Sequence, residues 1–290
     1  MLILIKSKKS QIMPTISVIV TTYNRKKNLS QALNSILKQT FFNFEIVVID
    51  NYSNYDIKSF IKEFDDDRIM VIQNNNKGNY VINRNLGIKK SRGEYITFCD
   101  DDDYWLPDKL TDQLELFSLA KKSEKVGLVY SKCHMLGAKG IYRVAPRMEL
   151  YNGHVFHRML FIPSVPILTA MVKREVFESI GYFNEDRAVL CQEDNEFWIR
   201  LSKYYSVKSS NTPTAVYREH EENLSNSNKI TLKARLYLHK HMIDSKIISY
   251  YEWLLFALPG LFFAHYLRRL VSLFRKILGS FKKNITTLKN

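Results

Sequence analysis

Four consecutive carboxylates, Asp100 to Asp103, form the most unusual chemical group in this chain of 290 residues. They follow an apolar run, GEYITFC, and precede an aromatic residue, a proline and a helical pattern. Adjacent carboxylates repel each other, so a fold keeps such a cluster on a solvated surface or around a cation. The sequence therefore favours a cation site here, and the alternative is an acidic cap on the helix that follows.

A second acidic pair, Glu193–Asp194, opens a segment with helical spacing at 192–204. A carboxylate in a cleft can take a proton from an attacking hydroxyl group. Acids at a helix start also have a purely structural explanation, because they cap the helix and complement its dipole. The pair is a candidate for general-base catalysis, with N-capping as the alternative.

The first half of the chain alternates between strand and helix patterns. Apolar, β-branched runs typical of strands buried on both faces occur at 16–21, 44–50, 68–73 and 93–99. Helical patterns separate them at 28–39, 57–64 and 80–90. This alternation predicts an α/β fold with right-handed crossovers, a mostly parallel central sheet and flanking helices.

Polar residues follow each of these four strands, in the stretches TTYNR, DNYS, NNNKGN and the acidic run. Ligands of such sheets bind beyond the carboxyl ends of the strands. Turns alone would account for Asn and Gly at these places, but no turn requires four carboxylates. We therefore expect a ligand site at this edge of the sheet.

The second half is less regular. Helical patterns occur at 109–120, 174–180 and 192–204, and strand patterns at 126–131, 167–173 and 214–220. Residues 132–167 read as irregular, with only short strand-like pieces.

The two ends of the chain differ from the middle. Residues 1–13 read as a disordered extension, whereas 229–290 read as a basic, amphipathic helical extension with twelve Lys or Arg against Asp244 and Glu252. The extension thus carries most of the net charge of +14. Its apolar stretch, 253–267, is shorter than the roughly 20 residues that span a bilayer. It favours a helix lying in the plane of an anionic membrane, and the alternative is a helix packed on its own domain or on a partner.

Composition adds two limits. A hydrophobic content of 46% indicates a globular core. Three widely spaced cysteines, Cys99, Cys133 and Cys191, form no metal pattern and fit a reducing compartment as buried small side chains.

With these residues placed, the chain resembles the family 2 glycosyltransferases, which are inverting, nucleotide-sugar-dependent enzymes of the GT-A fold. The resemblance runs through ISVIVTTYNR, QTFFNFEIVVID, NRNLGIKKSRGEYITFCDDDDYWLPDKL, IGYFNEDRAVLCQEDNEFWIRL and YREHEENLS. It covers about residues 14–228, in the family's order and spacing. It implies a GT-A domain at 14–228, and the basic helical extension at 229–290, which the sequence pattern favours as membrane-associating, lies outside it.

The resemblance implies a metal site for Mn²⁺ or Mg²⁺. Asp100 and Asp102 match the family's Asp-x-Asp pattern, and the cation would bridge the two phosphates of the donor. His220 matches a family histidine near the metal or the diphosphate, with an ordinary surface histidine as the alternative. Asp101 and Asp103 would orient or solvate the site, and both Asp100 and Asp101 would also belong to the donor-binding residues.

The resemblance also implies further contacts to the donor, from Thr21, Thr22, Tyr23, Asp50, Asn51 and Arg84. Asn51 departs from the family, which has an acid at that position to recognise uracil. An amide oxygen could still accept a base N–H, so the identity of the base stays open. Tyr52, where the family has glycine, is another departure. Arg84 would contact the donor diphosphate, and the alternative is an exposed helix arginine.

The family's Glu-Asp pair matches Glu193–Asp194, with Asp194 as the base and Glu193 beside it. The implied enzyme is a metal-dependent hexosyl- or N-acetylhexosaminyl-transferase that acts on a glycan or a lipid-linked acceptor in surface polysaccharide synthesis. It would work in the cytoplasm, peripherally on the inner face of the cytoplasmic membrane.

Two other classes of protein are alternatives to a glycosyltransferase. A nucleotidyltransferase could share the architecture and the metal, but it would need a Gly-rich phosphate loop, and TTYNRKKN contains no glycine. A non-catalytic basic protein that binds membrane or nucleic acid would explain the tail alone. No nucleic-acid partner is expected, because the excess of positive charge is confined to the end of the chain and is not interleaved with the core fold.

Overall fold

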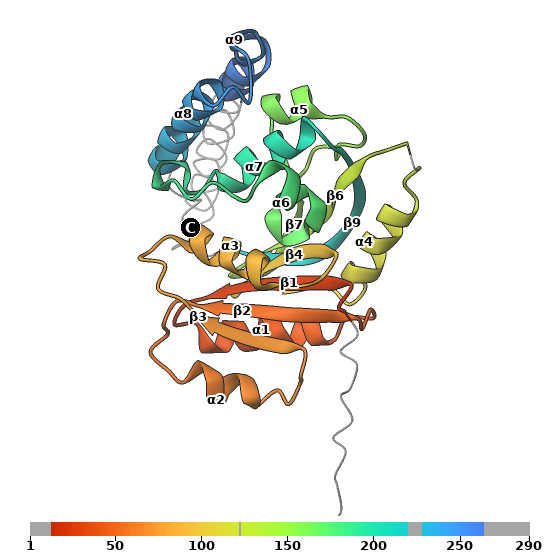
Figure 1. Ribbon diagram of the computed structural model, residues 1–290, viewed down its shortest axis with the longest axis vertical. Coiled ribbons are helices and arrows are strands. Elements are labelled where there is room, and N and C mark those ends of the chain that lie inside the picture. The colour runs from red at the N-terminus through yellow and green to blue at the C-terminus, as the bar shows by residue number, and fades with distance from the viewer. Residues whose placement is uncertain (1–12, 122, 220–227, 264–290) are drawn as a thin grey trace, which may run out of the picture.

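A nine-stranded sheet forms the centre of this computed structural model, which describes residues 13–121, 123–219 and 228–263 (Figure 1). Its strands are β1 (Ile16–Thr22), β2 (Phe44–Asp50), β3 (Ile69–Gln73), β4 (Tyr95–Asp100), β5 (Tyr104–Trp105), β6 (Val126–Gly137), β7 (Gly140–Ala145), β8 (Met171–Lys173) and β9 (Ser206–Arg218). They pair in the order β3-β2-β1-β4-β8-β6-β9-β5, and β7 pairs with β6 outside this path.

Helices cover both faces of the sheet. In chain order the α-helices are α1 (Lys26–Leu37), α2 (Ile57–Lys62), α3 (Tyr80–Lys90), α4 (Lys109–Ser118), α5 (Phe156–Phe161), α6 (Arg174–Ile180), α7 (Glu193–Ser202), α8 (Asn228–Asp244) and α9 (Tyr250–Glu252). Short 3-10 turns form η1 (Ile167–Thr169) and η2 (Arg187–Val189), and a π-helical segment forms η4 (Trp253–Ala257).

The first half of the sheet is parallel, as predicted. β1 lies between β2 and β4, and β2 pairs with β3, all in parallel register. Every residue of β2 is buried, because α1 and α2 lie on one face of the sheet and α3 lies on the other. The register brings the carboxyl ends of β1, β2 and β4 to one edge, with Thr21 opposite both Ile49 and Asp100.

The second half of the sheet is mixed. β8 is antiparallel to both β4 and β6, β5 is antiparallel to β9, and β6 is parallel to β9. The expectation that 132–167 is irregular was wrong over 132–145, where β6 continues and β7 follows, and over α5. β6 continues to Gly137 because Cys133 and Met135 alternate inward with half-exposed Lys132 and His134, and a hairpin then leads into β7. This alternation is only a few residues long, so it did not stand out in the sequence.

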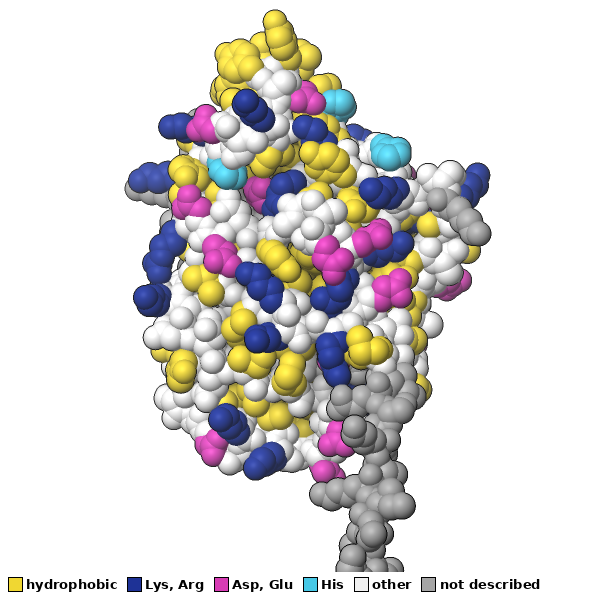
Figure 2. Space-filling view, in the orientation of Figure 1, with side chains coloured by type: hydrophobic (Ala, Val, Ile, Leu, Met, Phe, Trp, Pro, Cys, Tyr) yellow, Lys and Arg dark blue, Asp and Glu magenta, His cyan; other side chains and the backbone are white. Residues whose placement is uncertain are grey.

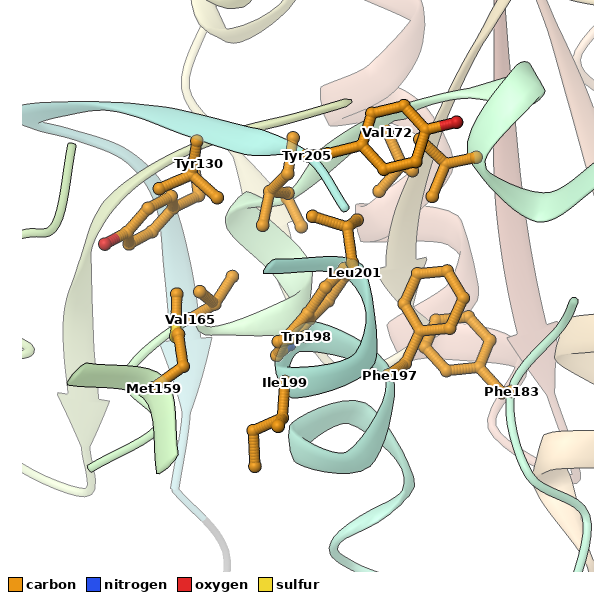
Figure 3. Packing of buried hydrophobic residues seen from close by; sticks show 14 of the residues in the cluster. Tyr130, Met159, Val165, Val172, Phe183, Phe197, Trp198, Ile199, Leu201 and Tyr205 are labelled. Carbon is orange, nitrogen blue, oxygen red and sulfur yellow. The ribbon is translucent and has the colours of Figure 1, made fainter. Parts of the chain in front are cut away.

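Two hydrophobic clusters lie on the two faces of the sheet. One contains side chains of α1, α2 and α4, and the other contains those of α3 and α5 to α8. Figure 3 shows the centre of the second cluster, where Trp198 of α7 lies between Met159 and Val165 on one side and Phe183 on the other. Because Phe197, Trp198, Ile199 and Leu201 are all buried, the packing fixes α7 relative to the sheet.

The C-terminal helices pack on the domain. Leu238 and Met242 of α8, together with Ile248 and Ala257, are buried in the same cluster as α7. Gly260 lies so close to the end of α5 that a Cβ atom there would be 1.9 Å from the carbonyl oxygen of Phe161. Within the described residues, one face of the extension therefore packs on its own domain, which was the alternative to a helix lying in the plane of a membrane.

Six apolar or aromatic side chains of α9, η4 and the helical residues that follow η4 are exposed. We call this group the apolar tip, and it consists of Tyr250, Tyr251, Leu254, Leu255, Phe262 and Phe263. Figure 2 shows yellow side chains gathered at the upper end of the molecule, where Figure 1 places α9. Within the described ranges, no helix is both long enough and apolar enough to cross a membrane.

Candidate active site

A cavity of about 480 Å³ opens at the carboxyl ends of β1, β2 and β4, beside the first turns of α3 and α7. It brings together most of the residues that the sequence marked: Thr21, Thr22, Tyr23, Asn51, Arg84, Asp100, Asp101, Asp102, Glu193 and Asp194. Asp50 does not line the cavity. His220 lies outside the described residues, so its assignment stays a prediction.

Cations and hydroxyl groups from other elements hold the acidic run in place. Asp100 accepts a hydrogen bond from Thr21 Oγ1 at 3.3 Å, and Arg84 Nη2 lies 3.6 Å from its Oδ1 atom. Arg25 Nη1 contacts both Asp101 Oδ1, at 3.1 Å, and Asp102 Oδ2, at 2.8 Å. The repulsion within the run is thus offset by two arginines, one after β1 and one in α3.

Two members of the run are buried. Asp101 accepts the Thr22 hydroxyl at 2.8 Å, and Asp103 accepts the backbone N–H of Arg218 at 2.9 Å. Burial raises the pKa of Asp101 to about 6, and burial raises the pKa of Asp103 well above its usual range. These two carboxylates orient the turn rather than meet solvent, and the acidic-cap alternative is wrong because the run leads into β5, while Asp108 is the N-cap of α4.

The donor set fits a hard divalent cation that is completed by a phosphate ligand. Asp100 and Asp102 both line the cavity and offer carboxylate oxygens. Within the described part of the chain, no group of three or more His, Cys, Asp or Glu side chains could hold a metal ion by itself. Mg²⁺ commonly binds through one or two carboxylates plus substrate phosphates, and not in an all-protein cage. The two aspartates match that mode of binding.

Arg84 is buried between the two acidic groups of the site. Its Nη1 atom lies 3.0 Å from Glu193 Oε1, on the opposite side from its contact with Asp100. Burial alone lowers the pKa of this guanidinium, but Asp100 and Glu193 raise it more, so the net shift is upward. The side chain is 4% exposed, so the alternative of an exposed helix arginine is wrong. Arg84 links the acidic run to the start of α7.

Glu193 and Asp194 differ in what they contact. Neither is the N-cap of α7, which is Gln192, although both lie in the first turn. Glu193 is held by Arg84 and by the Tyr80 hydroxyl at 3.1 Å, whereas the only hydrogen bond to the Asp194 side chain from described residues comes from the backbone N–H of Asn195. Burial, with a smaller contribution from Glu193, raises the pKa of Asp194 to about 7. Asp194 is therefore the carboxylate with fewer partners, and its raised pKa suits it to accept a proton.

The side chain of Asp50 shapes the end of β2, and its predicted contact to the donor stays a prediction. Asp50 is fully buried and accepts hydrogen bonds from the backbone N–H and hydroxyl of Ser53 and from Gln73 Nε2. These bonds hold the turn in which Tyr52, where the family has glycine, adopts a φ of +58°.

Asn51 has a fixed amide orientation. Its Oδ1 atom accepts the backbone N–H of Asn76 at 2.9 Å, and a backbone N–H can only donate. The amide nitrogen has no acceptor among the described residues, and the side chain lines the cavity. The group available to a ligand here is consequently a hydrogen-bond donor.

Several lining residues were not marked as site residues by the sequence, among them Arg25, Tyr80 and Cys191. Arg25 stands in the polar TTYNR stretch, so its position after β1 could have marked it. Tyr80 begins α3 like any other helix residue, and nothing in the sequence distinguishes it. Cys191 was expected to be buried, but it is partly exposed and has a φ of +69°, because the chain turns sharply there before α7.

The chain is similar to known proteins over most of its length. A relative from Escherichia coli, named UDP-Glc:alpha-D-GlcNAc-diphosphoundecaprenol beta-1,3-glucosyltransferase WfaP, is 28% identical over 217 residues, which is 73% of this chain and 80% of the relative. The structure of S. aureus TarS 1-349 in complex with UDP-GlcNAc matches with a TM-score of 0.60 and 22% identity, over 79% of this chain and 67% of that one.

A third match is the mannosyltransferase PcManGT from Pyrobaculum calidifontis in complex with GDP-Man and Mn²⁺. Its TM-score is 0.59 at 19% identity, over 82% of this chain and 66% of that one. At these identities the two solved structures establish the fold, which is the mixed α/β fold of the GT-A glycosyltransferases. Residues 17–180, more than half of the chain, match the family described as glycosyl transferase family 2. The chain therefore belongs to glycosyl transferase family 2.

Proposed function

We propose that the protein transfers a sugar, with inversion at the anomeric carbon, from a nucleoside diphosphate to a hydroxyl group of a glycan or lipid-linked acceptor. The observation that carries the proposal is that a single cavity is lined by Asp100 and Asp102 and also by the less engaged carboxylate of Asp194. The first two suit a metal-bound diphosphate, and the third suits an acceptor hydroxyl.

Asp100 and Asp102 would hold Mn²⁺ or Mg²⁺ together with the phosphates of the donor. When bound, the cation would neutralise charge that builds on the leaving nucleoside diphosphate. Arg84, buried beside Asp100, adds a fixed positive charge near the same place. Thr21 and Thr22 support the aspartates through their hydroxyl groups, which explains the two threonines at the end of β1.

Asp194 would act as the general base. The acceptor oxygen attacks the anomeric carbon from the face opposite the diphosphate, and its proton passes to a carboxylate oxygen of Asp194. A new bond forms between the carbon and the acceptor oxygen, and the bond to the diphosphate oxygen breaks. Glu193 would position Arg84 and take no proton, because it already accepts from Arg84 and from Tyr80.

The substrates are proposed from chemistry and from the relatives. The cavity suits a nucleotide sugar, with the exposed ring of Tyr23 available to stack on the base. The Escherichia coli relative is named for UDP-Glc and for a GlcNAc-diphosphoundecaprenol acceptor, which supports a hexosyl or N-acetylhexosaminyl donor and a lipid-linked acceptor here.

We place the reaction at the cytoplasmic face of the membrane, where the apolar tip and the basic extension would contact anionic lipid.

A donor-hydrolysis screen tests the function. UDP-glucose, UDP-N-acetylglucosamine, GDP-mannose and CDP-glucose would be incubated with the protein and Mn²⁺, and release of nucleoside diphosphate would be measured. Hydrolysis or transfer of at least one donor is expected, and the product should have the inverted anomeric configuration. Release of pyrophosphate from a nucleoside triphosphate and a sugar phosphate, with no donor turnover, would instead identify a nucleotidyltransferase.

A further inference from the structure

The Tyr80 hydroxyl group joins the start of α3 to the turn that precedes α7. It accepts the backbone N–H of Cys191 at 3.1 Å and donates to Glu193 Oε2 at 3.1 Å. A hydroxyl group can do both at once, because it has one proton and two lone pairs. Burial raises the pKa of Tyr80, so the proton that Glu193 accepts stays in place across the ordinary pH range.

The turn held by this hydroxyl is strained. Cys191 has a φ of +69°, in the left-handed region that is costly for residues with a Cβ atom. Glycine adopts this conformation without that cost. The bond from the Cys191 N–H to the Tyr80 hydroxyl ties this turn to the first residue of α3.

The strained turn lies three residues before Asp194. Phe197 and Trp198 anchor the body of α7 in the core (Figure 3), so a change of conformation at Cys191 would act mainly on the first turn of the helix. That turn carries Glu193 and Asp194. A displacement of about 1 Å at a general base is enough to lower the rate about 100-fold.

We propose that Tyr80 is a positioning residue, whose hydroxyl group holds the Cys191 turn in its left-handed conformation and thereby places Asp194 for proton transfer. The proposal rests on the proposed function for its kinetic consequence. The positioning itself concerns the protein alone and can be measured without any substrate.

The first experiment uses Tyr80→Phe, which removes the hydroxyl and keeps the ring. Hydrogen–deuterium exchange of peptides that cover 187–196 should become at least severalfold faster, since the Cys191 N–H loses its acceptor. Tyr130→Phe is the matched control, because the Tyr130 hydroxyl also accepts a backbone N–H, that of Tyr151, but lies in the core away from the cavity. Unchanged exchange over 187–196 in Tyr80→Phe would overturn the proposal, whatever the activity of the protein.

The second experiment measures transfer with Mn²⁺ and whichever of UDP-glucose, UDP-N-acetylglucosamine or GDP-mannose the wild type turns over. Tyr80→Phe should lower kcat at least tenfold while the donor KM stays within about twofold. Adding Cys191→Gly should restore most of the lost kcat, since glycine needs no bond to hold the turn, whereas adding Cys191→Ala should restore none.

A raised KM at unchanged kcat would mean that the hydroxyl binds substrate, and absence of rescue by Cys191→Gly would exclude positioning through the turn. Absence of turnover in the wild type would contradict the proposed function and would leave the exchange result to stand alone.

Discussion

At the scale of single residues, the site separates two carboxylates that are neighbours in the sequence. Glu193 is neutralised by Arg84 and bound by Tyr80, whereas burial keeps the proton affinity of Asp194 high. The two side chains are therefore suited to different tasks, Asp194 to accepting a proton and Glu193 to holding Arg84 in place.

Asp194→Asn should lower transfer at least about 100-fold while leaving donor binding near the wild-type value, because only the proton acceptor is lost. Steady-state kinetics with calorimetric binding of the nucleotide would measure both. Glu175→Gln is the matched control, since Glu175 is an exposed acid in the first turn of α6. A more severe loss of transfer in Glu193→Gln than in Asp194→Asn would exchange the two roles.

The pH dependence follows from the raised pKa of Asp194, about 7. A base must be deprotonated, so kcat should rise about tenfold per pH unit below 7 and level off above it. A kcat profile that is flat between pH 5 and 7 would argue against Asp194 as the base. In Asp194→Asn this limb of the profile should disappear.

Asp102→Asn should abolish metal-dependent donor turnover and keep the fold, since Asp102 lies in a turn between β4 and β5. The readouts are donor hydrolysis with a titration of Mn²⁺ and a thermal melt. Asp108→Asn makes the same change of charge at an exposed residue six positions on, outside the cavity, and should be active. Full wild-type activity in excess EDTA would refute the metal assignment.

Asn51 is predicted to select the nucleobase by donating a hydrogen bond. Asn51→Asp would replace that donor with an acceptor, so the preference for UDP over CDP should increase about tenfold, because N3 of uracil donates and N3 of cytosine accepts. Calorimetry with both nucleotides measures the ratio. Asn75→Asp adds the same charge at an exposed residue outside the cavity and should leave the ratio unchanged.

At the scale of elements, the sequence predicted long, strongly patterned pieces well. The strands at 16–21, 44–50 and 93–99 and the helix at 80–90 are present within a residue or two, because apolar periodicity and burial agree there. Strand β5 could not be predicted, since its two residues are fixed by pairing with β9 and not by any local pattern. Tyr80 and Cys191, two of the site residues that were missed, share this cause, because they meet only through the tertiary fold.

The packing of α8 gives a test at this scale. Met242→Ala should lower the free energy of unfolding by about 2–5 kcal/mol, since the side chain is fully buried in the cluster that holds α7. Leu236→Ala, on the half-exposed face of the same helix, should be close to neutral. Urea unfolding measures both, and equal effects would mean that α8 does not pack as described.

At the scale of the whole molecule, the elements that form the cavity and those that form the apolar tip share one hydrophobic core. Residues 184–187 join α8 to the cavity side of the domain, because the Tyr237 hydroxyl of α8 donates to Asp186 at 2.6 Å and Asn79, one residue before α3, donates to the carbonyl oxygen of Glu185 at 2.7 Å. An acceptor held at a membrane surface would therefore meet a cavity whose distance from that surface is fixed by the fold.

Membrane attachment should depend on the apolar tip and on salt. Full-length protein is expected to sediment with phosphatidylglycerol vesicles at low salt, since each basic residue near an anionic surface contributes about 1 kcal/mol. Tyr251→Ser with Leu255→Ser should reduce the bound fraction severalfold and leave donor hydrolysis intact, as should salt at about 0.5 M. Leu119→Ser, equally exposed but at the end of α4, is the control. Full-length protein that stays in the supernatant at low salt would refute attachment.

Deleting the extension, 229–290, would be a poor test of membrane attachment, because Ile248 and Ala257 belong to the hydrophobic core. The close approach of Gly260 to Phe161 offers a way to move the apolar tip without deleting core residues. A single methyl group at position 260 cannot fit at 1.9 Å from a backbone oxygen, so the segment around it must move away from α5. Alanine is ordinarily the mildest substitution for a helical glycine, yet here it would separate the helical segment around position 260 from α5. One mutation could thus change how the apolar tip is held on the domain and leave every cavity residue unchanged.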